Sequence, residues 1–184
     1  MELPNKKYKL ILADPPWSYD NLHTGRNMNH GVIDKYLTLS VEELKQFPIS
    51  NISQDDSYLF MWVTSPLLPE GIEVFKSWGY TYKAAIYWDK DTKGGLGYWL
   101  RGCVEICLLG KKGNVPPLRL QYPNIIKQKI TKHSQKPNKL YEMIESLNIN
   151  PKIELFSRNN REGWDSWGNQ VPPHCQKLLV TNGD

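Results

Sequence analysis

The chain has 184 residues, which is enough to bury one substantial hydrophobic core but short for two. Hydrophobic residues make up 40% of the sequence and charged residues 23%, a balance that excludes an intrinsically disordered chain. The net charge of +4 permits a polyanionic partner without requiring one. We therefore expect one domain over residues 1–184.

Strand-like runs alternate with helical ones along the chain. In order, strands are expected at residues 9–14, 58–64, 84–89, 104–109 and 152–157. Two of these runs are almost continuously apolar, as in parallel strands that are covered on both faces: residues 10–13 and 106–109. The alternation predicts an α/β fold, with helices on both faces of a mostly parallel sheet.

Three helices carry start and stop signals. Ser40 and Glu43 form a capping box for the first helix. The second begins at residues 65–66, where a serine precedes a proline, and ends at Gly79. Pro137 opens the third, which has an apolar stripe along one face.

Three segments lack a regular pattern: residues 18–34, 92–98 and 113–134. Segments of this length are usually functional or disordered. The last one overlaps a cluster of five lysines that contains no acidic residue, which is either a solvated face or a phosphate-contacting surface. Seven Trp and ten Tyr leave a similar choice between core packing and a stacking surface. The clustered lysines are Lys127, Lys129, Lys132, Lys136 and Lys139.

The remaining sequence features limit the location of the protein and its use of metals. The first residues are polar and the apolar run after them is short, so neither a signal peptide nor a membrane span is expected. Cys103 and Cys107 lie in an apolar stretch, where buried free thiols are expected. Free cysteines without a secretion signal favour the cytoplasm. The four histidines are scattered singly, so no metal site is expected.

The most informative motif is Asp14-Pro15-Pro16-Trp17, which directly follows the first strand. This places it at the carboxyl edge of the sheet, where open α/β folds bind ligands. A carboxylate and a proline-fixed backbone carbonyl can accept the two N–H hydrogens of an exocyclic aromatic amine, which frees the nitrogen lone pair. Trp17 would stack on the base. The alternative is a structural turn, because Asp-Pro pairs mark turns in many proteins.

The sequence resembles the adenine-N6 methyltransferases that carry Asp-Pro-Pro-Trp, a family that includes the catalytic subunit of the messenger RNA adenine methyltransferase and many bacterial and phage enzymes. The resemblance implies a Rossmann-like class I fold that binds S-adenosylmethionine, and a catalytic loop made of the four motif residues. It also implies that the chain can work as a homo- or heterodimer. Matching blocks follow one another in the same order at residues 9–17, 59–64, 86–90, 133–137, 152–158 and 167–170.

The resemblance also assigns a cofactor site. Asp14 is expected beside both the target amine and the methionine part of the cofactor, and Lys136 is expected near the cofactor carboxylate. The glycine-rich turn of many methyltransferases is replaced by residues 156–158, and Asn160 replaces a frequent histidine, which leaves its role open. The further cofactor contacts that the resemblance implies are Glu154, Phe156, Arg158, Asn160, Asn169 and Gln170.

Contacts to a nucleic acid are expected from aromatic and basic side chains. Tyr36 falls where a substrate-side aromatic is expected, and Trp17 and Trp62 are further candidates. Phosphate contacts are expected from Lys127, Lys129 and Lys132.

The sequence leaves the polymer open. A chain of this length has no room for a separate target-recognition domain, so specificity would come from loops or from a dimer partner. DNA is favoured for a bacterial or viral source, whereas RNA would be methylated by the same chemistry. A non-catalytic nucleic-acid-binding subunit is the third hypothesis, but such a subunit would be expected to lose the acid or the lysine that this chain keeps.

Overall fold

The computed structural model describes residues 2–18, 38–94, 99–130 and 135–168. Within these ranges, seven strands form one sheet in the order β5-β3-β4-β2-β1-β6-β7. The strands are β1 Tyr8–Ala13, β2 Ser53–Val63, β3 Thr81–Asp89, β4 Val104–Lys112, β5 Ile125–Lys127, β6 Lys152–Leu155 and β7 Asp165–Trp167.

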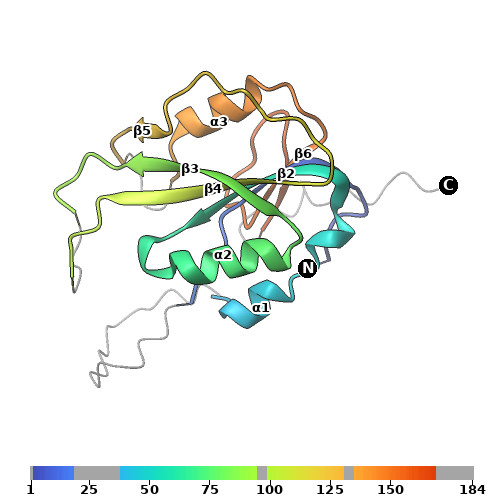
Figure 1. Ribbon diagram of the computed structural model, residues 1–184, viewed down its shortest axis with the longest axis horizontal. Helices are drawn as coiled ribbons and strands as arrows, with labels where there is room; N and C mark the ends of the chain where they lie inside the picture. Colours follow the sequence, from blue (N-terminus) through green and yellow to red (C-terminus); the bar gives the residue numbers. More distant parts are fainter. Residues whose placement is uncertain (1, 19–37, 95–98, 131–134, 169–184) are drawn as a thin grey trace.

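Helices cover both faces of the sheet, as the sequence predicts. On one face lie α1 (Val41–Lys45) and α2 (Leu68–Ser77), and on the other lies α3 (Asn138–Glu145) (Figure 1). Two short 3₁₀ helices, η1 (Ile49–Asn51) and η2 (Ser65–Leu67), precede β2 and α2. No helix in these ranges combines the length and the apolar character needed to cross a bilayer.

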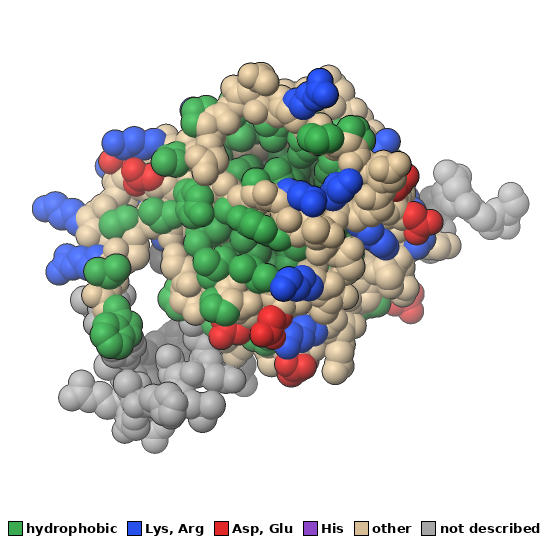
Figure 2. All heavy atoms as spheres, viewed as in Figure 1, with side chains coloured by type: hydrophobic (Ala, Val, Ile, Leu, Met, Phe, Trp, Pro, Cys, Tyr) green, Lys and Arg blue, Asp and Glu red, His purple; other side chains and the backbone are tan. Residues whose placement is uncertain are grey.

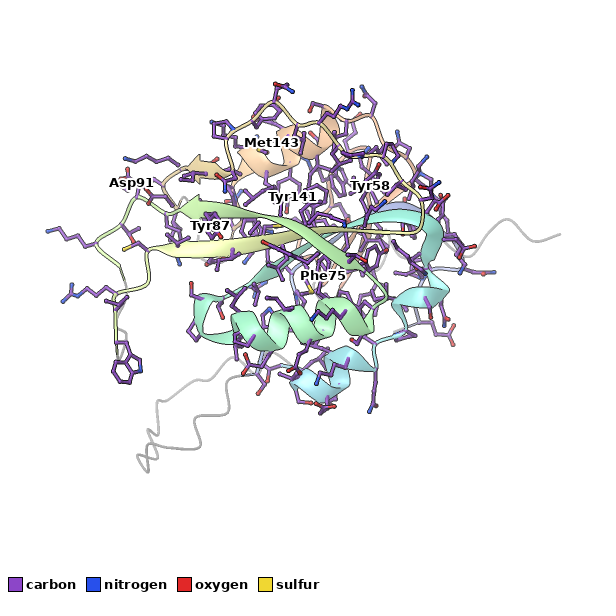
Figure 3. The ribbon with its side chains drawn as sticks, in the orientation of Figure 1. Tyr58, Phe75, Tyr87, Asp91, Tyr141 and Met143 are labelled. Atoms are coloured by element: carbon purple, nitrogen blue, oxygen red, sulfur yellow. The ribbon has the colours of Figure 1, made fainter. Side chains whose placement is uncertain are left out.

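The sheet separates two hydrophobic clusters, and β1 contributes alternate side chains to each. Ile11 packs with Phe75 of α2, whereas Leu12 packs with Met143 of α3. Figure 3 shows Phe75 and Met143 on opposite sides of the strands. Because β1 is buried on both faces, its sequence is continuously apolar rather than alternating.

Four of the six strand pairings in this sheet are parallel, but the prediction that residues 106–109 form a parallel strand is wrong. β4 is antiparallel to both β2 and β3. Its burial is as expected, since Ile106, Cys107 and Leu108 are 0–6% exposed. The direction follows from the connection, because the described residues between β3 and β4 contain no crossover helix to return the chain to the starting edge.

The local signals differ in how well they locate the elements. The capping box is confirmed, since the Glu43 N–H donates to Ser40 Oγ and the Ser40 N–H donates to the Glu43 carboxylate. The serine–proline signal at residues 65–66 begins the 3₁₀ helix η2 rather than α2. The α-helix follows directly at Leu68 and has Pro69 in its first turn. β5 and β7 were not predicted, since three-residue edge strands carry almost no periodicity.

The two described cysteines differ from the prediction in one respect. Both are free thiols, and Cys107 is fully buried, as expected. Cys103 is only partly buried, because it precedes β4 and lies outside the sheet.

Candidate active site

The carboxyl ends of three neighbouring parallel strands meet at one edge of the sheet. β1 lies between β2 and β6, so the chain runs to one side of β1 and later returns to the other. This reversal of strand order opens a crevice at the strand ends, the position at which open α/β sheets bind ligands. Asp14 follows β1 directly, Phe156 follows β6, and Lys136 lies just before α3.

Four charged side chains form a chain of ion pairs at this edge. Lys136 Nζ lies 3.0 Å from Asp14 Oδ1 and 2.9 Å from Glu105 Oε2. Lys90 Nζ lies 3.2 Å from Glu105 Oε1. The side chains of the two lysines are 14% and 19% exposed, so these pairs are far less screened by solvent than ordinary surface salt bridges. Two cations thus face two carboxylates in alternation.

Burial and these ion pairs shift the pKa values of Lys136, Glu105 and Asp14. Burial disfavours the Lys136 ammonium, but Asp14 and Glu105 outweigh that effect and raise the pKa of Lys136. Burial also disfavours the Glu105 carboxylate, but Lys136 and Lys90 reverse this and lower its pKa. For Asp14 burial prevails over Lys136 and raises the pKa, although water reaches the 29% of the side chain that remains exposed. Asp14 is therefore more basic than an ordinary aspartate, and Glu105 is less basic than an ordinary glutamate.

Three tryptophans pack together beside Lys136. Trp62 is 2% exposed, and Lys136 Nζ lies 5.2 Å from the centroid of its ring. Trp88 packs edge-on against Trp62, with 6.1 Å between the ring centroids. Trp17 is 8% exposed and donates from its indole N–H to the Trp62 carbonyl at 3.1 Å. Trp17 and Trp62 are thus mainly packing residues here, and their contact with a base stays a prediction.

Backbone hydrogen bonds fix the loop that follows β1. The Trp17 N–H donates to the Pro15 carbonyl at 2.9 Å, and the Leu39 N–H donates to the Pro16 carbonyl at 2.8 Å. The Ser18 N–H returns a bond to the Leu39 carbonyl at 3.0 Å. Each proline carbonyl therefore has one partner already, and a second lone pair remains for another donor. These hydrogen bonds and the two prolines together restrict the conformation of the loop.

A cavity of about 380 Å³ opens beside Asp14. Its walls come from the end of β1, the first residues of α3 and the segment that follows β6. Phe156 has a φ of +60°, and a Cβ at Gly168 would lie 2.2 Å from the Ser157 carbonyl oxygen, so the wall after β6 is tightly defined. The lining residues are Asp14, Gln135, Lys136, Asn138, Tyr141, Glu154, Phe156, Ser157, Arg158, Asn159, Asn160 and Arg161.

Glu154 is the one charged side chain among the described residues that is buried without a cation bonded to it. It is 8% exposed, and the Tyr141 hydroxyl donates to its Oε1 at 2.7 Å. Figure 3 shows Tyr141 lying between α3 and the sheet. Burial raises the pKa of Glu154 to about 7, although hydrogen bonds from Tyr141 and Ser157 oppose the rise. This carboxyl group therefore titrates near neutral pH.

Comparison with known proteins gives the family of the chain. The MT-A70 family model matches residues 8–170, nearly the whole length. The chain belongs to the MT-A70 family. It is 36% identical to the type II methyltransferase M.MunI from a Mycoplasma species, over 93% of this chain and 81% of that protein. It is also 34% identical to the human N(6)-adenosine-methyltransferase catalytic subunit METTL3, over 90% of this chain but 28% of METTL3. An Arabidopsis thaliana MT-A70-like N(6)-adenosine-methyltransferase is 32% identical, and the chain spans 24% of its length.

Most of the site residues expected from the MT-A70 motifs come together. Asp14, Lys136, Glu154, Phe156, Arg158 and Asn160 line the same cavity. Lys127 lies on β5 and Lys129 just after it, away from the cavity walls. Four expected residues lie outside the described ranges, and their roles stay predictions: Tyr36, Lys132, Asn169 and Gln170.

Sequence reasoning missed several residues of this MT-A70 site. Glu105 had a detectable signal, since it is a lone acid beside the apolar run of a predicted strand. Lys90 lies in a matching block but received no role. Arg161 directly follows the expected contact Asn160, whereas Tyr141 had no such signal, because only tertiary packing brings it from α3 to Glu154.

Proposed function

We propose that this chain transfers the methyl group of S-adenosylmethionine to the exocyclic N6 amine of adenine in DNA. The observation that carries the proposal is the position of Asp14. It belongs to the Asp-Pro-Pro-Trp loop, lines the cavity and is paired with Lys136, all at the carboxyl edge of the sheet. One carboxylate therefore serves both the cofactor pocket and the surface on which a base would enter.

The cavity suits the proposed cofactor. Its volume lies in the range of small-molecule sites, and its lining mixes two aromatic rings, Tyr141 and Phe156, with cationic, anionic and amide groups. S-adenosylmethionine supplies, when bound, an electrophilic methyl group on a positively charged sulfur. Lys136 uses two of its three N–H donors on Asp14 and Glu105, which leaves the third for the cofactor carboxylate. Arg158 lines the same cavity, and the family resemblance implies that it contacts the ribose hydroxyls of the cofactor.

Asp14 performs the chemical role on the substrate side. Its carboxylate accepts one N–H hydrogen of the adenine amine, and a proline carbonyl of the loop accepts the other. This arrangement turns the nitrogen lone pair away from the ring system. Burial makes Asp14 more basic than an ordinary carboxylate, which suits it to hold the proton that the amine loses. Lys136 keeps the carboxylate oriented throughout, because it is itself anchored on Glu105.

The edge formed by β3 and β5 fits a polyanion. Tyr87 and Ile125 are paired in register and are 39% and 58% exposed. Lys127 follows two residues after Ile125, on the same face of β5, and Lys129 is exposed just beyond. On the face shown in Figure 2, a field of apolar side chains has lysine and arginine side chains at several points of its margin, with acidic ones among them at the upper left and the lower edge. Aromatic stacking surface beside phosphate-binding cations is the combination that binds nucleic acid.

DNA is the polymer we favour. The type II methyltransferase matches over most of its own length, whereas the relatives named for adenosine, a ribonucleoside, match through about a quarter of theirs. We also propose that loops of this domain take part in reading the target. If the target adenine lies in a duplex it must leave the stack, at a cost of about a few kcal/mol. Single-stranded DNA should then be methylated faster.

The test is transfer of a tritiated methyl group to matched oligonucleotides. The purified chain is supplied with labelled S-adenosylmethionine and with single-stranded DNA, duplex DNA or RNA of one sequence, and mass spectrometry identifies the methylated nucleoside. We expect N6-methyladenine in DNA, with higher initial rates on the single strand. Label in RNA alone would move the substrate to RNA. Oligonucleotide binding without any binding of S-adenosylmethionine would assign the chain to the non-catalytic subunits.

A further inference from the structure

Arg161 connects the segment after β6 to both ends of α3. Its Nη1 donates to Asn138 Oδ1 at 2.9 Å, and Asn138 is the first residue of the helix. Its Nε and Nη2 donate to the two carboxylate oxygens of Glu145, the last residue. Asn138 and Glu145 are seven positions apart and lie on one helix face, so the guanidinium extends along that face. The paired contact with Glu145 uses the fork geometry that only arginine offers.

The same guanidinium lies over the ring of Tyr141, which projects from the middle of this helix face. The guanidinium carbon of Arg161 is 4.6 Å from the ring centroid. Trp164 also packs edge-on against the Tyr141 ring, with 5.9 Å between centroids, and its indole N–H donates to Glu145 at 2.8 Å. Tyr141 is therefore contacted by two residues that share one carboxylate. Its hydroxyl has a fixed direction, toward Glu154 Oε1.

These contacts point to a role for residues that touch no expected reacting atom. We infer that Arg161 is a positioning residue for the cofactor: by bracing α3 and the Tyr141 ring, it keeps the Tyr141 hydroxyl on Glu154 and so holds that carboxylate in place as an acceptor on the cavity wall. The inference rests on the proposed function for the identity of the ligand. The contacts of Arg161 with α3 and with the Tyr141 ring form in the chain without any ligand. A carboxylate at this position accepts hydrogen bonds from hydroxyl or ammonium groups and attracts a cationic ligand.

The pKa of Glu154 depends on the hydrogen bond from Tyr141, so it measures whether Arg161 holds Tyr141 in place. The groups that face it are Tyr141 from α3, Asp14 from the end of β1, and Ser157 and Arg161 from the segment after β6. Hydrogen bonds from Tyr141 and Ser157 stabilise the carboxylate, as does the positive charge of Arg161, whereas Asp14 destabilises it. Losing the Tyr141 bond should therefore raise the pKa of Glu154. Arg161→Lys keeps the positive charge but loses the paired contact with Glu145 and the stacking on the Tyr141 ring.

The experiment follows the Glu154 carboxyl carbon by NMR in full-length protein labelled with ¹³C-glutamate, with no ligand present. Glu154→Gln identifies the signal. In the wild type a midpoint near pH 7 is expected. Tyr141→Phe should raise it by about one pH unit, since a hydrogen bond to a charged group is worth about 1.5–3 kcal/mol. Arg161→Lys should raise it in the same direction, and the double variant should shift no further than Tyr141→Phe alone, because both changes remove the same bond.

Two further variants make the result decisive. Glu145→Gln leaves Arg161 in place but weakens its anchor, so it should also raise the midpoint. Tyr58→Phe is the matched control, because it removes a phenol that donates to the Pro116 carbonyl outside the cavity, and it should leave the midpoint unchanged. A wild-type midpoint in Arg161→Lys, or a double variant whose shift equals the sum of the two single shifts, would overturn the inference.

Calorimetric titration with S-adenosylmethionine at pH 8 separates this inference from the proposed function. We expect Tyr141→Phe and Arg161→Lys to weaken binding several-fold, with a larger effect on KM for the cofactor than on kcat. NMR shifts as expected in a protein that binds no S-adenosylmethionine would leave the bracing intact and remove the proposed function. Normal cofactor binding in the wild type together with unchanged NMR midpoints in the variants would overturn the inference about Arg161 and leave the proposed function intact.

Discussion

Lys136 Nζ lies 3.0 Å from Asp14 Oδ1, and this contact joins two parts of the site that lie far apart in the sequence. Asp14 comes from the loop after the first strand, whereas Lys136 precedes the last helix. Because Lys136 is also held by Glu105, the carboxylate of Asp14 cannot rotate freely toward solvent. The Asp14 carboxylate is thus prearranged by an ion pair as well as by the loop.

Replacing the carboxylate of Asp14 tests its role as the acceptor. Asp14→Asn should lower the rate of methyl transfer by about 100-fold or more, because the amide cannot hold the proton that the amine loses. Initial rates with labelled S-adenosylmethionine provide the measurement. Asp91→Asn is a matched control, since Asp91 is exposed in the connection after β3, and asparagine tolerates its φ of 48°. Turnover in Asp14→Asn equal to that of the control would remove Asp14 from the mechanism.

Lys136 should matter most for cofactor affinity. Lys136→Met removes the cation between Asp14 and Glu105, so the pKa of both carboxylates should rise and the cofactor carboxylate should lose its partner. We expect the dissociation constant for S-adenosylmethionine to rise by about tenfold or more, consistent with one charge-assisted hydrogen bond of about 1.5–3 kcal/mol. Titration calorimetry measures it. Lys139→Met, an exposed lysine of α3, should bind the cofactor normally. Equal affinity in the two variants would contradict the assignment.

The lysines on and after β5 should contribute to the salt dependence of nucleic-acid binding. The double variant Lys127→Gln, Lys129→Gln should reduce the slope of log affinity against log salt by about 1.4 on single-stranded DNA, or about 0.7 per lost phosphate contact. Fluorescence anisotropy with a labelled single-stranded oligonucleotide gives this slope. A matched double variant at Lys7 and Lys9 changes the same charge at the amino end of β1. If both double variants change the slope equally, the effect reflects net charge rather than a binding surface.

Glu154 should make the protein less stable as pH rises. Its pKa is about 7 in the folded chain against an ordinary 4.5, so the folded state binds the proton more tightly. Stability from this group is fully present below pH 4.5 and is lost as pH rises through 7, by about 3 kcal/mol in total. Glu154→Gln keeps an acceptor for Tyr141 but cannot ionise.

Urea unfolding of wild type and Glu154→Gln at pH 5 and pH 8 measures this effect. The variant should gain stability relative to the wild type on going from pH 5 to pH 8. A difference between the two proteins that does not change with pH would show that Glu154 ionises normally in the folded chain.

The sequence alone determined the chemistry of the first strand end. A buried apolar run followed by Asp-Pro-Pro-Trp predicts a rigid acceptor at a sheet edge, because strand burial and proline geometry are local properties. The same local reasoning located the capping box of α1 and the start of α3 at Pro137. The resemblance to known methyltransferases then selected Lys136, Glu154, Phe156 and Arg158, and all of them line the cavity.

Only the tertiary structure decided which charges meet. The antiparallel direction of β4 brings Glu105 beside Lys136, and α3 brings Tyr141 and the segment of Arg161 to Glu154. Pairings of this kind depend on strand order and helix packing between distant segments, which periodicity and spacing do not contain. The protonation of the site carboxylates also depends on the tertiary structure, because the pKa of a carboxylate is set by its burial and by neighbours that are distant in the sequence.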